Sequence, residues 1–295
     1  MAPTAAKALR VIELLAAEPT TELSLAEMRR RLGYSHGNLH AICTTLVAMG
    51  HLRREQGERG FRLGPALLSV GAAARAAYPS VEVALPFLHT LAAEFDTESH
   101  AAMRAGDTIV VVARVGRALP EYGVQVGQRF PLIPPMGSTF VAWADDHERE
   151  AYLASAVGVL RADEIARCRA GLRSTVERGY SIHIDVEPSR QMRHTAERIR
   201  EEAAVDRDGE LRTLVQQLGR HDYTASEVDQ IRAGRYLQVS APAFDCRGVV
   251  ELSVGVSLRA TADGIAAVRA LGERVVATAR MITRAIGGHT PDIDA

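Results

Sequence analysis

The chain has 295 residues, enough for two domains, and its 47% hydrophobic and 24% charged residues are typical of a soluble globular protein. The formal net charge of −1 makes the chain as a whole neither strongly basic nor strongly acidic. No apolar run approaches the roughly 18 residues of a membrane span, and the N-terminus lacks the pattern of a signal peptide. We therefore expect no membrane insertion and no secretion.

The charge is divided unevenly along the chain. Residues 1–77 hold ten Lys and Arg against six Glu, whereas residues 78–295 hold 25 basic against 30 acidic residues. A basic N-terminal module on an acidic body favours local contact with a polyanion. The three cysteines, Cys43, Cys168 and Cys246, are odd in number and far apart, which predicts no disulfide framework and a cytoplasmic location.

Two helices are expected at the N-terminus, over 5–17 and 24–32. The inner face of the first carries three apolar residues: Leu9, Ile12 and Leu15. In the second, Ser24 suits the N-cap and Glu27 stands three residues further on, the pattern of a capping box. Gly33 follows the last apolar residue, where a left-handed helix cap favours glycine.

A third helix is expected over 35–49, with Ser35 as its N-cap and Gly50 closing it. One stripe of this helix is apolar and should be buried: Leu39, Ile42, Cys43 and Leu46. The opposite face is small or carries hydrogen-bonding groups, as in helices that read the major groove: His36, Asn38, His40, Ala41 and Thr44. We predict base contacts by His36, Asn38 and His40, flanked by Ser35 and Thr44. The alternative is that these residues face solvent or phosphates.

A basic hairpin should follow, with short strands over 51–54 and 60–63 on either side of a polar turn. Arg53, Arg54 and Arg59 would reach DNA phosphates from it. Helix, turn, helix and hairpin in this order predict a winged helix-turn-helix. The alternative is a small helical subdomain with a solvated charged hairpin.

Past this hairpin, the alanine-rich residues 65–77 predict a connecting helix, and Tyr78-Pro79-Ser80 marks a domain boundary. Further helices are expected over 83–95, 137–144, 148–156, 162–178 and 262–287. Strands are expected over 97–105, 108–115, 122–126, 181–186, 236–241 and 249–256. This order implies an α+β domain in which helices pack on an antiparallel sheet.

Residues 188–235 interrupt this order. The stretch is charged and helix-forming, with nine Arg and nine Asp and Glu, and two helices joined near 206–209 fit it best. It is interpreted as a charged helical insertion. Three roles remain open for it: a solvent-exposed excursion, an oligomer contact, or a lid over a pocket.

Over nearly the whole chain except this insertion, the sequence resembles the IclR family of bacterial transcriptional regulators. The resemblance is carried by five motifs: the helix-turn-helix 33–50, Phe61-Arg62-Leu63-Gly64-Pro65, and the segments 126–132, 137–142 and 239–245. It implies a winged helix-turn-helix at 1–64, a linker helix at 65–78, a GAF-like effector domain at 79–288 and a tail at 289–295. Relatives form dimers and tetramers and respond to small, often acidic or aromatic, metabolites.

The chain departs from the family pattern at four positions. Ala41 stands where relatives commonly carry an arginine, and Ser138 stands where lysine is usual. Gln238 replaces a cysteine, and Gly255 replaces the first of two serines, of which Ser257 is the second. The resemblance therefore implies DNA binding more directly than it implies a particular effector.

A candidate effector site begins at Gly137. A helix that starts there would offer free backbone N–H groups to a carboxylate, and Ser138 and Thr139 add hydroxyls. The alternative is an ordinary glycine-started helix. The resemblance implies that Asp185, Gln238 and Ser257 line the same pocket, and the alternative is that they are polar strand ends facing water.

The expected function is that of a transcriptional regulator that binds a double-stranded DNA operator and a small-molecule effector, as a homodimer or homotetramer. We expect no cofactor, no metal and no catalytic residue, because the sequence has no nucleophile elbow, phosphate-binding loop, dinucleotide fingerprint or metal-ligand spacing. The alternative is a GAF-type sensor or enzyme whose N-terminal module mediates protein contacts.

Overall fold

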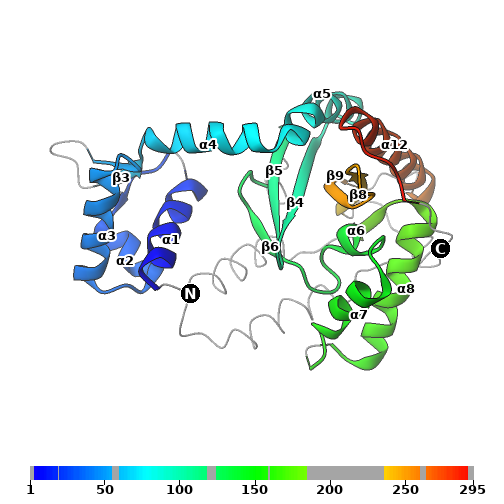
Figure 1. The fold of residues 1–295 in the computed structure, drawn as a ribbon, viewed down its shortest axis with the longest axis horizontal. Coiled ribbons are helices and arrows are strands. Elements are labelled where there is room, and N and C mark those ends of the chain that lie inside the picture. Colours follow the sequence, from blue (N-terminus) through cyan, green and yellow to red (C-terminus); the bar gives the residue numbers. More distant parts are fainter. Residues whose placement is uncertain are drawn as a thin grey trace. The chain divides into compact units, whose positions relative to one another are not determined.

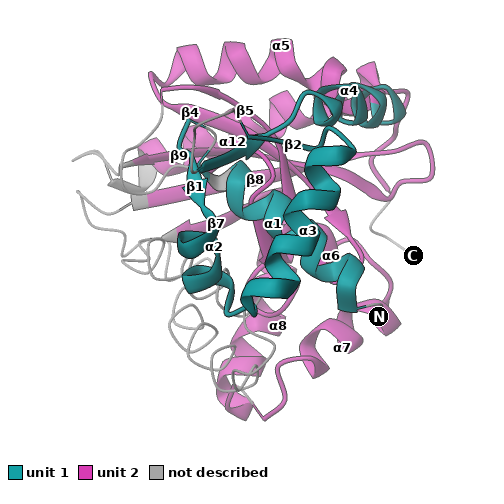
Figure 2. Cartoon of the chain, turned by 90° about the vertical axis from the view of Figure 1, so that its left-hand side faces the viewer, with its two compact units in different colours: residues 1–78, 198–205 teal, residues 79–197, 206–295 magenta. Residues whose placement is uncertain are grey.

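The structure is a computed structural model, which describes residues 3–18, 20–54, 60–117, 124–158, 160–184, 236–259 and 264–291. Figure 2 shows the two compact units into which the chain divides, with the boundary between Tyr78 and Pro79. The predicted insertion 188–235 and the candidate site residues Arg59 and Asp185 lie outside the described residues. None of the described helices is both long and apolar enough to cross a membrane.

The first unit is a winged helix-turn-helix, as predicted. It contains α1 (Pro3–Ala17), β1 (Leu23–Ser24), α2 (Leu25–Leu32), α3 (His36–Ala48), β2 (Leu52–Arg53), β3 (Gly60–Leu63) and α4 (Ala66–Ala77) (Figure 1). The strands form a small antiparallel sheet in the order β1-β3-β2, in which Leu52 pairs with Leu63. Its core holds apolar side chains from all three first helices and the sheet, among them Leu15, Met28, Leu39 and Phe61.

The ends of α2 follow the local signals in the sequence. The Glu27 N–H donates to Ser24 Oγ at 3.1 Å, and Gly33 closes the helix in a left-handed conformation. Only half of the capping box forms, because the Glu27 carboxylate binds two arginines of its own helix instead. Ser35 occupies the N-cap of α3 as predicted, although its side chain makes no capping hydrogen bond.

The second unit is built on a six-stranded antiparallel sheet. Its strands are β4 (Glu98–Ala105), β5 (Thr108–Gly116), β6 (Arg129–Pro131), β7 (Ser181–Ile184), β8 (Tyr236–Phe244) and β9 (Val250–Arg259). The order is β6-β5-β4-β9-β8-β7, so β4 and β9 are central neighbours although they lie far apart in the sequence. Its helices are α5 (Pro79–Glu94), α6 (Ser138–Val141), α7 (Asp146–Ala154), α8 (Ala162–Arg178) and α12 (Gly264–Ala285).

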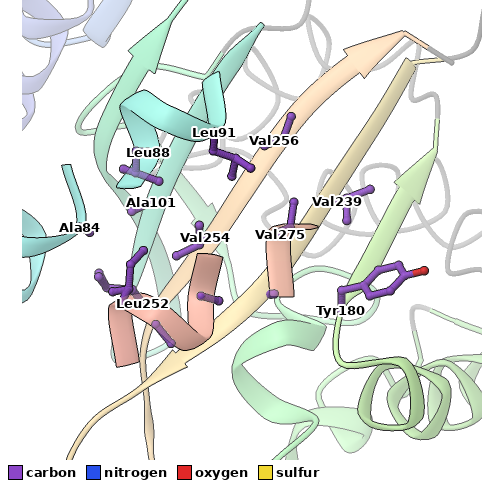
Figure 3. Close-up of a cluster of buried hydrophobic side chains, with 14 of the residues drawn as sticks. Ala84, Leu88, Leu91, Ala101, Tyr180, Val239, Leu252, Val254, Val256 and Val275 are labelled. Carbon is purple, nitrogen blue, oxygen red and sulfur yellow. The ribbon is translucent and has the colours of Figure 1, made fainter. Parts of the chain in front are cut away.

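The two faces of this sheet bury different side chains. On one face α5 and α12 cover the main apolar core, where Leu88 and Val275 pack with Val254 and Val256 of β9 (Figure 3). Side chains of a strand alternate between faces, so Ser253, Gly255 and Ser257 of the same strand lie on the other face. A second apolar cluster joins α6, α7 and α8 to that other face.

The strand predicted over 122–126 is wrong in its described part. Residues 124–126 are not a strand, and the edge strand β6 lies further along the chain. The reason is a turn at Gly127, whose N–H donates to the Val111 carbonyl at 2.8 Å, while the Val111 N–H donates to the Gln128 carbonyl at 2.9 Å. These bonds bring the chain back along β5, where Phe130 pairs with Ile109.

The helix predicted over 137–144 is also wrong in length, because α6 is a single turn. Gly137 precedes it in a left-handed conformation, with φ of 85°. The chain leaves the helix because Asp145 caps the next one, and its carboxylate accepts from the Glu148 N–H at 2.8 Å. A single turn carries only a small dipole, so the helix-terminus argument for an anion at Gly137 loses its force.

Candidate DNA-reading helix and effector site

The candidate DNA-reading helix α3 is held by the buried stripe that the sequence predicts. Leu39, Ile42, Cys43 and Leu46 are all buried. The residues predicted to contact DNA are exposed, with one exception: Ser35, His36, His40 and Thr44 are exposed, and Asn38 is half-buried. Asn38 Oδ1 is buried and accepts no hydrogen bond from any described residue. The exposed face of α3 is thus available to a partner along its whole length.

Two histidines stand one helical turn apart on α3. The rings of His36 and His40 are stacked, with their centroids 6.3 Å apart and an interplanar angle of 26°. Both side chains are exposed. A neutral imidazole offers one donor and one acceptor, so this pair provides hydrogen-bonding groups without a fixed charge.

The arginines of the first unit fall into two groups. Arg53 and Arg54 are exposed at the end of β2, and the Arg54 guanidinium lies 5.2 Å from the centre of the Phe61 ring. Arg30 and Arg31 of α2 are bound by a carboxylate, since each donates to Glu27 at 2.6 Å. Hydrogen bonds from these two arginines lower the pKa of Glu27 to about 2.

In the second unit, the strand register gathers polar residues into two rows on one face of the sheet. The first row crosses β5, β4, β9, β8 and β7 at Arg114, His100, Gly255, Ser240 and Ser181. The second row crosses β4, β9, β8 and β7 at Glu98, Ser257, Gln238 and His183. We call these residues the polar rows. They include Gln238 and Ser257 from the sequence prediction, and the prediction missed the other polar side chains.

His100 reaches across β9 because Gly255 has no side chain. Its Nε2 lies 3.0 Å from Gln238 Nε2 on β8, and a Cβ at Gly255 would stand 2.5 Å from His100 Nε2. The amide nitrogen can only donate, so His100 Nε2 accepts and the ring proton lies on Nδ1. Burial, and secondarily the charge of Arg114, lowers the pKa of His100 to about 4, so the ring is neutral near pH 7.

This depressed pKa predicts a loss of stability in acid. Between pH 6.5 and about 4 the unfolded chain binds a proton at His100 and the folded chain does not. The free energy of unfolding should therefore fall with decreasing pH by roughly 1.4 kcal/mol per pH unit, or about 3 kcal/mol over this window. Urea denaturation of the wild type and of His100→Gln between pH 7 and pH 4 measures the difference. Parallel stability profiles for the two proteins would mean that His100 titrates normally in the folded state.

The short helix α6 meets the polar rows through hydroxyl groups. Thr139 Oγ1 and Ser181 Oγ lie 2.7 Å apart, and the Ser181 hydroxyl also donates to the Ser240 carbonyl at 3.3 Å. This contact joins Gly137, Ser138 and Thr139 to the first polar row. The sequence prediction brought these residues together with Gln238 and Ser257. In the structure Gly137 precedes α6, Ser138 and Thr139 lie on it, and Gln238 and Ser257 lie on β8 and β9, the strands that α6 contacts.

Three buried polar atoms at this place have no hydrogen-bond partner among the described residues. They are Ser138 Oγ, Ser257 Oγ and His100 Nδ1, in side chains that are at most 3% exposed. Buried polar groups are nearly always hydrogen-bonded in folded proteins, to protein, water or ligand. These three atoms, on α6, β9 and β4, therefore retain unused hydrogen-bonding capacity.

An ion pair between a buried carboxylate and a partly exposed arginine borders these atoms. Glu98 is fully buried, and its carboxylate accepts from Arg114 Nε at 2.8 Å and from the Val124 N–H at 3.0 Å. The pair fixes the segment after Val124 to the central strand β4. Across the described parts of the chain, no three His, Cys, Asp or Glu side chains converge as metal ligands.

Residues 4–56 match the family model described as the IclR helix-turn-helix domain. A search among curated protein sequences returned no significant match. The fold of almost the whole chain is similar to solved structures of IclR regulators. One from Alicyclobacillus acidocaldarius has a TM-score of 0.65 and 18% identity, with 97% of this chain and 100% of that chain covered.

Two further structures show the same similarity of fold. The Thermotoga maritima IclR has a TM-score of 0.59 and 16% identity, with 97% of this chain and 100% of that chain covered. An IclR homologue from Microbacterium hydrocarbonoxydans, in complex with 4-hydroxybenzoate, has a TM-score of 0.64 and 17% identity, with 96% and 99% covered. At these identities the comparison establishes the fold.

Proposed function

Since residues 4–56 are an IclR-type helix-turn-helix domain in a chain with the fold of IclR regulators, we propose that this protein is a cytoplasmic, ligand-responsive transcriptional regulator and not an enzyme. Residues 1–64 bind a double-stranded DNA operator, residues 65–78 form the linker, and residues 79–288 bind the effector. The observation that carries the proposal is α3, whose buried stripe leaves a polar face exposed within the matched domain.

The DNA contacts are assigned by chemistry. The residues of α3 that face outward or lie at its edge enter the major groove: Ser35, His36, Asn38, His40 and Thr44. The arginines of the hairpin, Arg53, Arg54 and Arg59, contact phosphates. Phosphate contacts fix the position of the protein on the duplex and base contacts give specificity. The two groups therefore make separable contributions to binding.

Removing the Arg53 side chain should weaken binding to all DNA sequences by a similar factor. Each phosphate that the protein no longer neutralises flattens the slope of log K against log salt by roughly one unit. Fluorescence anisotropy of the full chain on operator and on random duplex, measured over a series of salt concentrations, tests Arg53→Ala. Arg169→Ala, which removes an exposed arginine of the second unit, is the matched control and should leave the slope unchanged.

Two results would count against this assignment. An unchanged salt slope in Arg53→Ala would remove the hairpin from the phosphate contacts. Equal affinity of the wild type for every duplex tested would contradict specific DNA binding, and would favour a sensor whose N-terminal module binds protein.

The effector site of this proposal is formed by α6 and the polar rows. Its assigned residues are Gly137, Ser138, Thr139, Asp185, Gln238 and Ser257. The support is the set of buried hydroxyl and imidazole atoms that no described residue satisfies. The 4-hydroxybenzoate complex of the Microbacterium homologue supports a carboxylate or aromatic metabolite as the ligand. Binding would favour one arrangement of the DNA-binding domains over another, a shift in population transmitted through the linker.

The proposed assembly is a homodimer or homotetramer. Its support is α4, in which none of the residues is buried within the chain. Leu68 and Val70 on this helix are 76% and 55% exposed. Pairing of two chains would also place two helix-turn-helix domains on successive half-sites of a palindromic operator.

A further inference from the structure

The outward face of α3 is small and carries no charge. Successive residues of a helix are turned by about 100°, so the buried stripe places the opposite side at Gly37, Ala41, Thr44 and Ala48. Ala41, Thr44 and Ala48 are exposed, and a Cβ added to Gly37 would meet no atom within 4 Å. The helix, which is described throughout, contains no Asp, Glu, Lys or Arg. A DNA groove could therefore approach this backbone closely.

The hydrogen-bonding side chains lie at the two edges of this face. His36 and His40 form one edge, and Asn38 and Thr45 form the other. Thr45 uses its hydroxyl within the helix, donating to the Ala41 carbonyl at 2.9 Å. On the centre of the face, Ala41 thus offers a methyl group to a facing base pair, and Thr44 offers a methyl group beside its hydroxyl.

The chemistry of the base edges decides what such a face can read. Guanine is read most often by a bidentate Arg or Lys, and α3 offers neither. Thymine presents its 5-methyl group in the major groove, and it is recognised by apolar contact with Ala or with the Thr methyl. Ala41 and Thr44 are three residues apart, about 4.5 Å along the helix axis. That separation is close to the spacing of about 3.4 Å between successive bases of a strand.

Building on the DNA-binding function proposed above, we propose that Ala41 and Thr44 select thymine at two successive base pairs of each half-site through methyl–methyl contacts. Arginine contacts from outside α3 position the protein on the backbone. The histidines at the edge supplement the readout with single hydrogen bonds.

Replacing single thymines by uracil tests this proposal, since uracil lacks only the 5-methyl group. The full chain first selects duplexes from a random pool, and anisotropy then gives Kd for each selected duplex and its uracil derivatives. We expect two successive thymines per half-site at which uracil raises Kd roughly fourfold, the factor that about 0.8 kcal/mol for one buried methyl corresponds to. Thr44→Ser, which removes the protein methyl and keeps the hydroxyl, should abolish that sensitivity at one thymine.

Thr45→Ser is the matched control, because it makes the same change at the edge of the face and should leave the uracil effect intact. If duplexes are enriched but uracil has no effect at any thymine, the proposed methyl contacts are wrong. The proposed function as a DNA-binding regulator is then unaffected. The same holds if Thr44→Ser leaves the uracil effect unchanged. If the pool yields no enriched sequence, specific DNA binding itself fails, and this proposal fails with it.

Discussion

Replacing Gly137 by valine should lower the free energy of unfolding of the C-terminal unit by about 2–5 kcal/mol. The residue has φ of 85°, a left-handed conformation that costs an L-residue about 1–2 kcal/mol. Its Cβ would overlap Leu132 Cδ1 and stand 2.8 Å from Ile109 Cδ1, and overpacking of this kind costs about 1–3 kcal/mol more. Urea denaturation followed by circular dichroism measures the change.

Gly127→Val is the matched control. Gly127 has the same φ of 85°, but a Cβ there would meet no atom within 4 Å. The free energy of unfolding of Gly127→Val should therefore fall only by the cost of the left-handed backbone, about 1–2 kcal/mol. Equal losses in the two variants would mean that Leu132 and Ile109 move aside at little cost, and that close packing is not what requires glycine at 137.

The same two variants test the location of the effector site. In a thermal-shift screen of aromatic and aliphatic carboxylates, including 4-hydroxybenzoate, a ligand that stabilises the wild type should still stabilise Gly127→Val. It should fail to stabilise Gly137→Val, while DNA affinity without ligand stays unchanged, because Gly137 belongs to the second compact unit. Identical ligand-induced shifts in all three proteins would place the site elsewhere.

Replacing Arg114 by methionine should lower the free energy of unfolding by about 3–5 kcal/mol near neutral pH. The Glu98 carboxylate is fully buried, and Arg114 is the cation bound to it. Removing one partner of a buried ion pair leaves an uncompensated charge in a medium of low dielectric constant. Chemical denaturation at pH 7 gives the loss directly.

Two further variants separate this effect from a general loss of a salt bridge. Arg169→Met breaks an exposed pair, since Arg169 and Glu150 are 44% and 60% exposed, and such a pair is worth about 0–1 kcal/mol. Glu98→Gln combined with Arg114→Met removes the orphaned charge and should restore part of the stability. If Arg114→Met costs no more than Arg169→Met, Glu98 is not held as a buried carboxylate.

The order and type of most elements could be predicted from the sequence, because the signals are local. The stripe of Leu39, Ile42, Cys43 and Leu46 repeats at the helical period, and all four are buried. Ser24 caps α2 as its position suggests, and α8 has the predicted bounds of 162–178. The predictions failed at 122–126 and at 137–144, where a turn against β5 and the cap of α7 decided the outcome.

Some residues of the candidate effector site could likewise be named from the sequence, and others could not. Gly137, Ser138 and Thr139 could be named from the sequence since they are consecutive, and Gln238 and Ser257 were named through the family resemblance. His100 and Ser240 were missed. A signal existed in β8 and β9, where Gln238 and Ser240, like Ser253 and Ser257, alternate with apolar residues. Alternation shows which residues share a face, but it does not show which strands are neighbours.

The sequence alone determined the winged helix-turn-helix, its buried stripe and its uncharged outward face, because residues within one helix are placed by its period. Only the tertiary structure decided the polar rows. They exist because β4 pairs with β9 and β9 with β8, in a register that sets His100 beside Gly255 and Gln238 beside Ser257. That register depends on burying one face of the sheet against α5 and α12, since a shift by one residue would exchange the two faces.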